Sequence, residues 1–139
     1  MTDASEAASE AAAPKPQRSV LVIFTQTTLL LEALATFFAT LVTWGLGRAE
    51  VVDVSPGLVW VAGSALAAAF ALASSRAGSR WGRWLGWALH APLIAGGLLV
   101  PTIAFVGVMF LAVYGIGVRW GARIDRERAE RAQAQGASQ

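Results

Sequence analysis

Long apolar stretches alternate with short polar segments along most of the chain. The apolar stretches cover residues 20–46, 57–73, 84–99 and 102–118. About 20 helical residues cross the roughly 30 Å hydrocarbon core of a bilayer, so each stretch has the approximate length of a membrane-spanning helix. The pattern therefore predicts an all-α fold, that of a polytopic membrane protein with four transmembrane helices.

The last two stretches follow each other almost without interruption. Residues 84–118 contain one readily ionisable side chain, that of His90, and are too many for a single span. Gly96, Gly97 and Pro101 lie near the middle. We expect a tight hairpin there, because lipid tolerates irregular backbone poorly unless a turn reaches the headgroups. The alternative is one long kinked helix, which would put the chain's ends on opposite sides of the membrane.

The two ends of the chain lack this apolar character. Residues 1–18 are rich in Ala, Ser, Glu and Pro, which predicts a disordered cytoplasmic tail. The apolar run that follows is far longer than the roughly 7–15 residues of a signal-peptide core, so we expect no signal peptide. The transmembrane domain is expected to cover residues 19–120. Residues 121–139 are predicted to form a charged cytoplasmic tail that begins as a helix and ends in polar disorder.

Basic residues set the expected orientation. Three clusters fall on one side of the predicted spans, namely Lys15 and Arg18, then Arg76, Arg80 and Arg83, then Arg119, Arg123, Arg126, Arg128 and Arg131. Only Arg48 falls on the other side. The positive-inside rule therefore places both termini in the cytoplasm.

Tryptophans mark the same boundaries. Trp81, Trp84 and Trp120 fall where the third and fourth helices should meet the cytoplasmic headgroups, and Trp44 falls at the outer end of the first helix. The run RWGRW at residues 80–84 could instead stack on nucleic-acid bases. Because this run leads directly into an apolar span, we expect a membrane interface and no nucleic-acid partner.

The composition supports a membrane protein and excludes several kinds of site. Charged residues make up 14% of the 139 residues, against about a quarter in soluble domains. The chain has no cysteine and one histidine, which excludes disulfides, thiolate metal sites, cysteine nucleophiles and histidine-rich metal sites. It contains no nucleotide-binding loop, zinc motif or nucleophile elbow. We therefore expect no catalytic residues, no metal and no cofactor.

Glu32 lies near the middle of the first apolar stretch, where an ionisable group is costly and marks a candidate functional site. Polar residues recur around it at three- and four-residue steps, and at about 100° per residue they fall on one helix face. This polar stripe consists of Thr25, Thr28, Glu32, Thr36, Thr40 and Thr43, and the opposite face carries Leu30, Leu34, Phe37 and Leu41. We expect the stripe to face neighbouring helices and the apolar face to contact lipid.

His90 in the third stretch is the natural partner of Glu32, and Ser64 in the second lies near the same depth. With Thr36 they form a candidate intramembrane polar cluster that could serve an ion, a proton or a substrate. The alternative is structural. The threonines would then only bond to adjacent helices, Glu32 would be neutral, and His90 would bond to a threonine or a backbone carbonyl.

Small residues and arginines suggest further contacts. Gly63, Ala67 and Ala71 repeat every four residues in the second stretch, and such residues let helices approach closely in lipid. The cytoplasmic basic rim could bind anionic lipid headgroups. Its candidate residues are Arg76, Arg80, Arg83, Arg119 and Arg123.

Two stretches resemble a known family, LLLEALATFFATLVTWGLG at residues 29–47 and GRWLGWALHAPLIAGGLLVPTIAFVGVMFLAVYGIGVR at residues 82–119. Leu-Glu-Ala at 31–33 and Gly-Gly…Pro at 96–101 carry most of the similarity. The family comprises small actinobacterial integral membrane proteins of unknown function, often encoded beside folylpolyglutamate synthase and nucleoside diphosphate kinase. The resemblance implies four helices and a bacterial plasma membrane, and it implies no activity.

Two functions remain as hypotheses. The first is a non-catalytic accessory or interaction protein whose partners are the lipid bilayer and a second copy or another membrane protein. The second is a small proton-coupled transporter that uses Glu32, because a four-helix chain with a glutamate in its first helix resembles the small multidrug exporters. Those exporters that work as antiparallel dimers carry little charge bias, whereas the bias here is strong.

Overall fold

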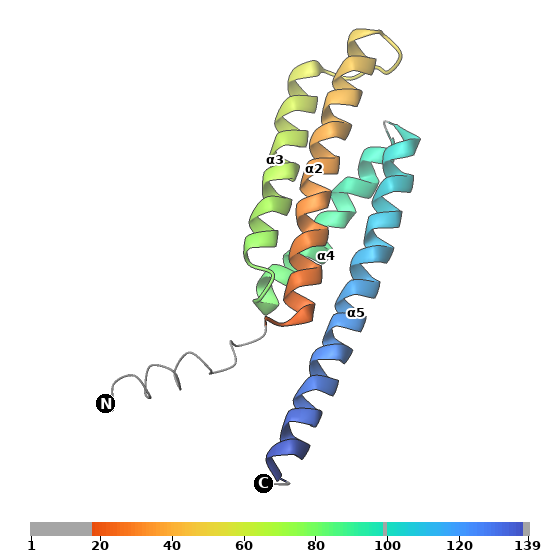
Figure 1. The fold of residues 1–139 in the computed structure, drawn as a ribbon. Helices are drawn as coiled ribbons and strands as arrows, with labels where there is room; N and C mark the ends of the chain where they lie inside the picture. Colours follow the sequence, from red (N-terminus) through yellow and green to blue (C-terminus); the bar gives the residue numbers. More distant parts are fainter. Residues whose placement is uncertain (1–17, 99, 138–139) are drawn as a thin grey trace, which may run out of the picture.

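The structure, a computed structural model, describes residues 18–98 and 100–137, and the regular elements in this part are all helices. They are α2 (Val20–Arg48), α3 (Pro56–Ser75), α4 (Arg80–Ala95), the short 3₁₀ turn η1 (Gly96–Leu98) and α5 (Pro101–Ala137) (Figure 1). The predicted all-α fold with four main helices is confirmed. The predicted N-terminal tail lies almost entirely outside the described residues.

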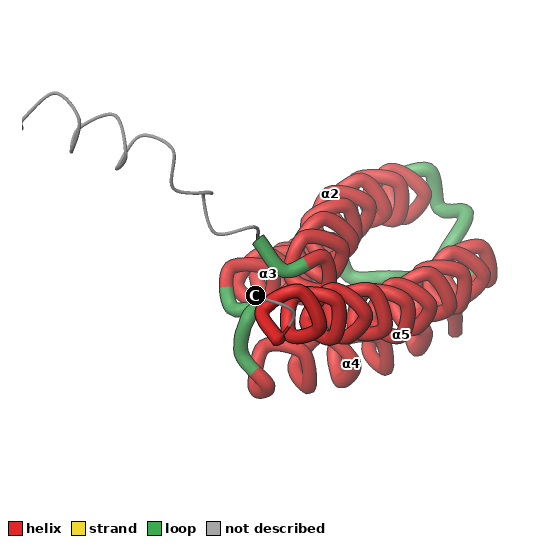
Figure 2. The backbone as a smooth tube through the Cα atoms, turned by 60° about the horizontal axis from the view of Figure 1, so that its bottom comes forward, coloured by secondary structure: helices red, strands yellow, loops and turns green. Residues whose placement is uncertain are grey.

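The four helices form an elongated bundle. α2 and α3 run antiparallel side by side, α5 lies along another side of α2, and α4 crosses obliquely between α3 and α5 (Figures 1 and 2). The start of α2, the α3–α4 loop and the C-terminal half of α5 lie at one end of the bundle (Figure 1). The α2–α3 loop lies at the opposite end, and the α4–α5 turn stops short of it.

The α4–α5 connection is a hairpin, so the prediction of two helices is confirmed and the single kinked helix is wrong. The N–H of Val100 bonds to the Gly96 carbonyl at 3.2 Å, which closes the turn before α5 begins at Pro101. A Cβ on Gly97 would lie 2.1 Å from the Cβ of Ala104. The turn therefore needs glycine, because a side chain there would collide with the first turns of α5.

Two predicted boundaries were wrong. α4 begins at Arg80 rather than 84, because the Ser79 hydroxyl accepts the N–H of Gly82 at 2.9 Å and caps the helix there. It ends at Ala95 rather than 99, where the 3₁₀ turn η1 begins. The apolar pattern marks the part of a helix that suits lipid, not the place where the helix starts. The other two helices match more closely, at 20–48 against 20–46 and 56–75 against 57–73.

The tail predicted at residues 121–139 begins as a helix, as expected, but the polar disorder expected at its end is wrong for the described residues, because α5 continues without a break to Ala137. Alanine, glutamine, glutamate and arginine favour helix, and they dominate this segment. Glu127 also pairs with the arginines four residues before and after it, at 2.9 Å to Arg123 and 3.8 Å to Arg131.

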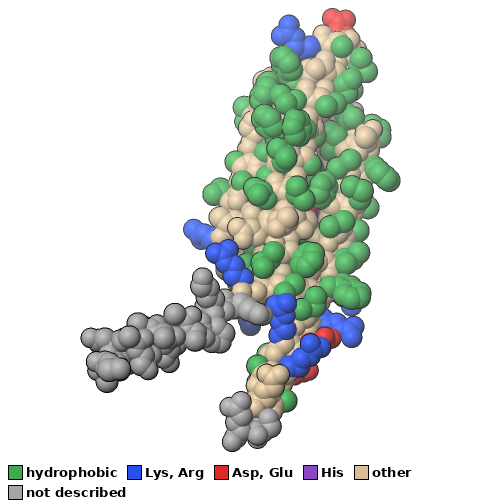
Figure 3. All heavy atoms as spheres, in the orientation of Figure 1, with side chains coloured by type: hydrophobic (Ala, Val, Ile, Leu, Met, Phe, Trp, Pro, Cys, Tyr) green, Lys and Arg blue, Asp and Glu red, His purple; other side chains and the backbone are tan. Residues whose placement is uncertain are grey.

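The surface suits a bilayer. Three helices, α2, α3 and α5, are long and apolar enough to cross a membrane, and together they indicate a multi-pass membrane protein. α4 has 16 residues and starts with two arginines in its first turn. Hydrophobic side chains cover the middle of the visible face, and most of the visible Lys and Arg side chains lie toward the end where α5 leaves the bundle (Figure 3).

Candidate functional site

The polar stripe on α2 faces the interior of the bundle. All six of its members are buried, whereas Leu30, Leu34 and Phe37 on the opposite face are exposed and Leu41 is partly exposed. The prediction from the 3.6-residue period is therefore confirmed. Glu32 enters the bundle because it belongs to this stripe, and α4 crosses α2 at that depth.

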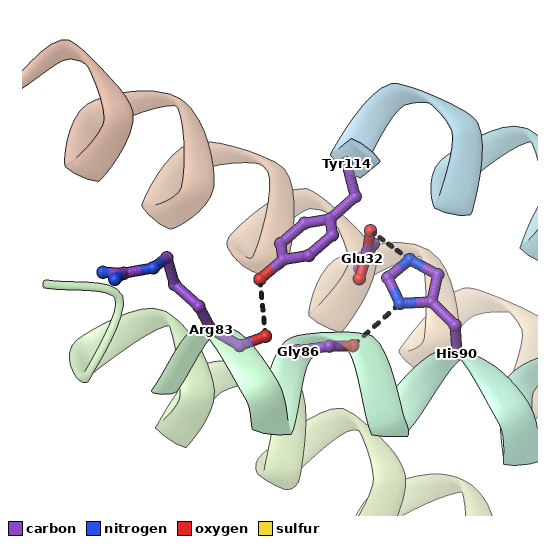
Figure 4. Close-up of polar contacts among 5 residues, drawn as sticks. All are labelled: Glu32, Arg83, Gly86, His90 and Tyr114. Atoms are coloured by element: carbon purple, nitrogen blue, oxygen red, sulfur yellow. Dashed lines mark hydrogen bonds and ion pairs between the residues drawn. The ribbon is translucent and has the colours of Figure 1, made fainter. Parts of the chain in front are cut away.

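Glu32 meets His90 of α4 inside the bundle (Figure 4). The Nε2 atom of His90 lies 3.0 Å from Oε1 of Glu32, and the two side chains are 1% and 0% exposed. The Nδ1 atom of the same ring lies 2.8 Å from the backbone carbonyl oxygen of Gly86, one helical turn earlier. The pair therefore joins α2 to α4 with both imidazole nitrogens engaged.

The geometry fixes how many protons this site holds. A carbonyl oxygen can only accept, so Nδ1 of His90 carries a hydrogen and donates it to Gly86. The contact between Nε2 and Oε1 then requires one further proton, on either atom. The pair is a neutral imidazole with a protonated carboxyl group or an imidazolium with a carboxylate, and its net charge is zero in both forms.

Aromatic rings enclose the pair. The ring centroid of His90 lies 5.9 Å from that of Phe70 on α3 and 5.3 Å from that of Tyr114 on α5. The Tyr114 hydroxyl donates to the backbone carbonyl of Arg83 at 3.0 Å, so it points along α4 rather than toward Glu32 (Figure 4). A Cβ on Gly86 would lie 2.4 Å from that hydroxyl oxygen. All four helices thus contribute to one buried site.

Tyr114 was missed in the sequence analysis. It is the one tyrosine of the chain and stands in an apolar stretch. A buried tyrosine hydroxyl usually has a hydrogen-bond partner. A single tyrosine within an apolar stretch was therefore the available signal for a buried polar contact.

The other two members of the predicted cluster behave differently. Ser64 is exposed on the outer face of α3, so its inclusion was wrong. Its neighbour Gly63 faces α2 instead, and one residue turns a helix by about 100°. Thr36 is buried one turn from Glu32, but within the described residues neither its hydroxyl nor Oε2 of Glu32 has a hydrogen-bond partner.

A cavity of about 210 Å³ lies beside Thr36, between α2, α3 and the tip of the α4–α5 hairpin. Its wall is mostly aliphatic, and the hydroxyl-bearing residues in it are Thr36, Thr40 and Thr43. No group of three or more His, Asp or Glu side chains within residues 18–98 and 100–137 could hold a metal ion.

The predicted basic rim gathers at one end of the bundle. Arg76, Arg80, Arg119 and Arg123 are exposed, and Arg83 is partly buried. Trp81, Trp84 and Trp120 are 73%, 72% and 61% exposed at the same end. At the opposite end Trp44 packs against Trp60, with Arg48 over its ring.

Comparison with known proteins identifies a family but no characterised relative. No curated protein and no solved structure matches the chain. A match to DUF4233, described as a protein of unknown function, extends over residues 23–130. The matched range includes Glu32, His90 and Tyr114, and it covers more than half of the sequence. The chain therefore belongs to the DUF4233 family of proteins of unknown function.

Proposed function

We propose that the chain is a non-catalytic accessory or interaction protein of the bacterial plasma membrane, with four spans and both termini in the cytoplasm. The orientation is supported by the arginines of the described residues, most of which lie toward the end of the bundle where α2 begins and α5 leaves (Figure 3). The partner is a second copy of the chain or another membrane protein.

The buried contact between Glu32 and His90 carries this proposal. Oε1 of Glu32, both ring nitrogens of His90 and the hydroxyl of Tyr114 are engaged with groups of the same chain. The three side chains are at most 1% exposed. Such a pair stabilises the contact between helices in lipid, where water is absent and cannot serve as the hydrogen-bond partner. A catalytic or transport group must instead reach a substrate.

The C-terminal part of α5 supports an interaction role. Residues 128–137 are exposed along their whole length, and this part of the helix extends beyond the bundle (Figure 1). In the proposed orientation it projects into the cytoplasm. An exposed helix that extends beyond the bundle is accessible to a partner.

Complementation of a deletion strain tests the proposal. Growth would first be compared across cationic toxicants, pH and folate-pathway stress to find a phenotype. A Glu32→Gln protein should restore growth, because glutamine can still bond to His90. A chain that ends after Glu127 should insert into the membrane and fail to restore growth. A well-folded Glu32→Gln protein that cannot complement would contradict the accessory role.

A second candidate function is proton-coupled transport, and the single shared proton between Oε1 of Glu32 and Nε2 of His90 favours it. A carrier of this kind needs a group that gains and releases a proton inside the membrane. Ethidium uptake into proteoliposomes under an imposed pH gradient would measure the activity. Under this alternative Glu32→Gln folds normally and abolishes the exchange.

A further inference from the structure

A groove lies between the first turns of α4 and the part of α5 beside it. Its lining residues are Arg80, Arg83, Trp84 and Trp87 from α4 and Val118 from α5. The volume is about 590 Å³, which lies within the range of sites that bind small molecules. This α4–α5 groove is at the arginine-rich end of the bundle.

Positive charge in the α4–α5 groove is not balanced by an acidic side chain. The lining contains two arginines and no Asp or Glu, and neither arginine forms an ion pair within the described part of the chain. Nη1 of Arg83 donates to the carbonyl oxygens of Ala77 and Gly78 at 3.4 and 3.3 Å. A guanidinium has five N–H donors, so these bonds position Arg83 and leave donors for an anion.

A second basic groove on α5 shows the contrast. It is lined by Arg119, Trp120, Arg123, Arg126 and Glu127. The Glu127 carboxylate lies 2.9 Å from Nε of Arg123 and 3.8 Å from Nη2 of Arg131. A carboxylate within the groove neutralises part of its charge and repels a phosphate. The α4–α5 groove is therefore the better site for an anion.

The apolar part of the α4–α5 groove points to a lipid rather than a soluble anion. Trp84 and Trp87 are 72% and 43% exposed, and Trp87 is held edge-to-face against Tyr114 at 5.4 Å between ring centroids. A soluble phosphate would use only the arginines. A phospholipid would also use the indoles and Val118, which begin the apolar surface of the bundle.

We infer that the α4–α5 groove binds an anionic phospholipid of the cytoplasmic leaflet. Arg80 and Arg83 bind the headgroup phosphate, and an acyl chain lies along Trp87 and Val118. The choice of leaflet rests on the orientation given in the proposed function. The choice of lipid rests on the groove itself.

Quenching of tryptophan fluorescence by brominated lipids tests this inference on the full chain. Trp44, Trp60, Trp81 and Trp120 would be replaced by phenylalanine, so that the two groove tryptophans report. Vesicles would contain phosphatidylglycerol and phosphatidylcholine, with bromine on the acyl chains of one lipid at a time. Since each arginine near an anionic surface contributes about fivefold in affinity, we expect at least about a fivefold preference for phosphatidylglycerol.

The arginine variants make the test specific. Arg80→Gln should remove most of the preference, and Arg83→Gln should do the same if its loop contacts survive. Arg119→Gln loses the same charge at the same end but outside the groove, so it should keep the preference. Equal quenching by the two lipids, or equal losses in Arg80→Gln and Arg119→Gln, would overturn the inference. Both leaflets have the same composition here, so the result does not depend on how the protein inserts.

Discussion

At the scale of single residues, Glu32 shows how a carboxyl group is accommodated inside an apolar helix bundle. Its Oε1 atom shares a proton with Nε2 of His90, and the Gly86 carbonyl fixes the hydrogen on the other ring nitrogen. The pair carries no net charge while it holds that proton, which avoids the cost of an isolated charge in lipid.

Substitutions at Glu32 should separate hydrogen bonding from ionisation. In Glu32→Gln the amide can donate to Nε2 of His90, so we expect thermal unfolding in detergent close to that of the unaltered protein. Glu32→Leu leaves that nitrogen buried without a hydrogen-bond partner and should lower the free energy of unfolding by about 1–3 kcal/mol. Leu34→Ala is the matched control on the same helix, because Leu34 is exposed and its loss should change stability little. Equal unfolding temperatures for Glu32→Leu and the unaltered protein would show that the contact between Glu32 and His90 does not stabilise the bundle.

Part of this site was predictable from the sequence. The helical period assigns Glu32 and the threonines to one buried face, and the position of His90 in its stretch predicts it within side-chain reach of Glu32. The positions of two residues could not be predicted from the sequence. To place Ser64, one must know how α3 is rotated about its axis, and an alanine-rich segment does not define that rotation. To place Tyr114, one must know how α4 crosses α5, which depends on packing between distant segments.

At the scale of elements, the start of α2 is held by a side chain of α5. The Asp125 carboxylate accepts the hydroxyl of Ser19 and the N–H groups of Val20 and Leu21, the last two at 2.8 and 3.1 Å. Asp125 lies beyond the apolar part of α5. Partial burial raises its pKa, but the three hydrogen bonds and the charge of Arg128 outweigh that effect and lower the pKa below its ordinary value.

This cap should make stability depend on pH in the acid range. A carboxyl group whose pKa is lowered on folding stabilises the fold above its unfolded pKa of about 3.9, and the contribution disappears as pH falls through the native pKa. Asp125→Ala should therefore lower stability by about 1 kcal/mol at pH 7, with a difference that shrinks below about pH 4. Thermal unfolding in detergent at several pH values measures this, and Glu130→Ala on the exposed part of α5 is the control. A difference that persists unchanged at pH 3 would exclude the ionised cap.

The contact between α2 and α3 depends on Gly63. A Cβ on this residue would lie 2.0 Å from the hydroxyl oxygen of Thr40, so the predicted close approach is confirmed at this position. Gly63→Leu should lower folded yield and the unfolding temperature, because the leucine forces the two helices apart. Ala65→Leu adds bulk to an exposed position of α3 and should be tolerated. Similar behaviour of the two variants would mean that α2 and α3 are not packed this tightly.

Helix ends were harder to predict than helix faces. α3 begins at Pro56, one residue before its apolar stretch, because proline suits the first turn of a helix. α4 begins at Arg80, four residues before its apolar stretch, because charged residues there interrupt the apolar pattern while leaving the helix intact. For α5 the apolar stretch ends near residue 118, but the helix continues with favourable residues and ion pairs to Ala137. Hydropathy thus indicates which part of a helix suits lipid, whereas capping and helix propensity determine where the helix begins and ends.

At the scale of the whole molecule, the two hairpins differ in reach. α2 has 29 residues and α4 has 16, lengths of about 44 and 24 Å. Because α4 is also tilted, the turn at Gly96–Leu98 stops short of the α2–α3 loop (Figure 1). We expect this turn to lie deeper in the outer interface than that loop.

Cysteine labelling can test both the orientation and the depth, since the chain has no cysteine of its own. In the proposed arrangement a membrane-impermeant maleimide added to intact cells should label Asp53→Cys, in the α2–α3 loop. Gly78→Cys, in the α3–α4 loop, and Gly136→Cys, near the end of α5, should react only after the membrane is permeabilised. Leu98→Cys, where the native side chain is 91% exposed, should react from outside but more slowly than Asp53→Cys, because its turn lies deeper.

Labelling of Gly136→Cys in intact cells would place the C-terminus outside and rule out both termini being cytoplasmic. Complete protection of Leu98→Cys would show that α4 enters the membrane without crossing it.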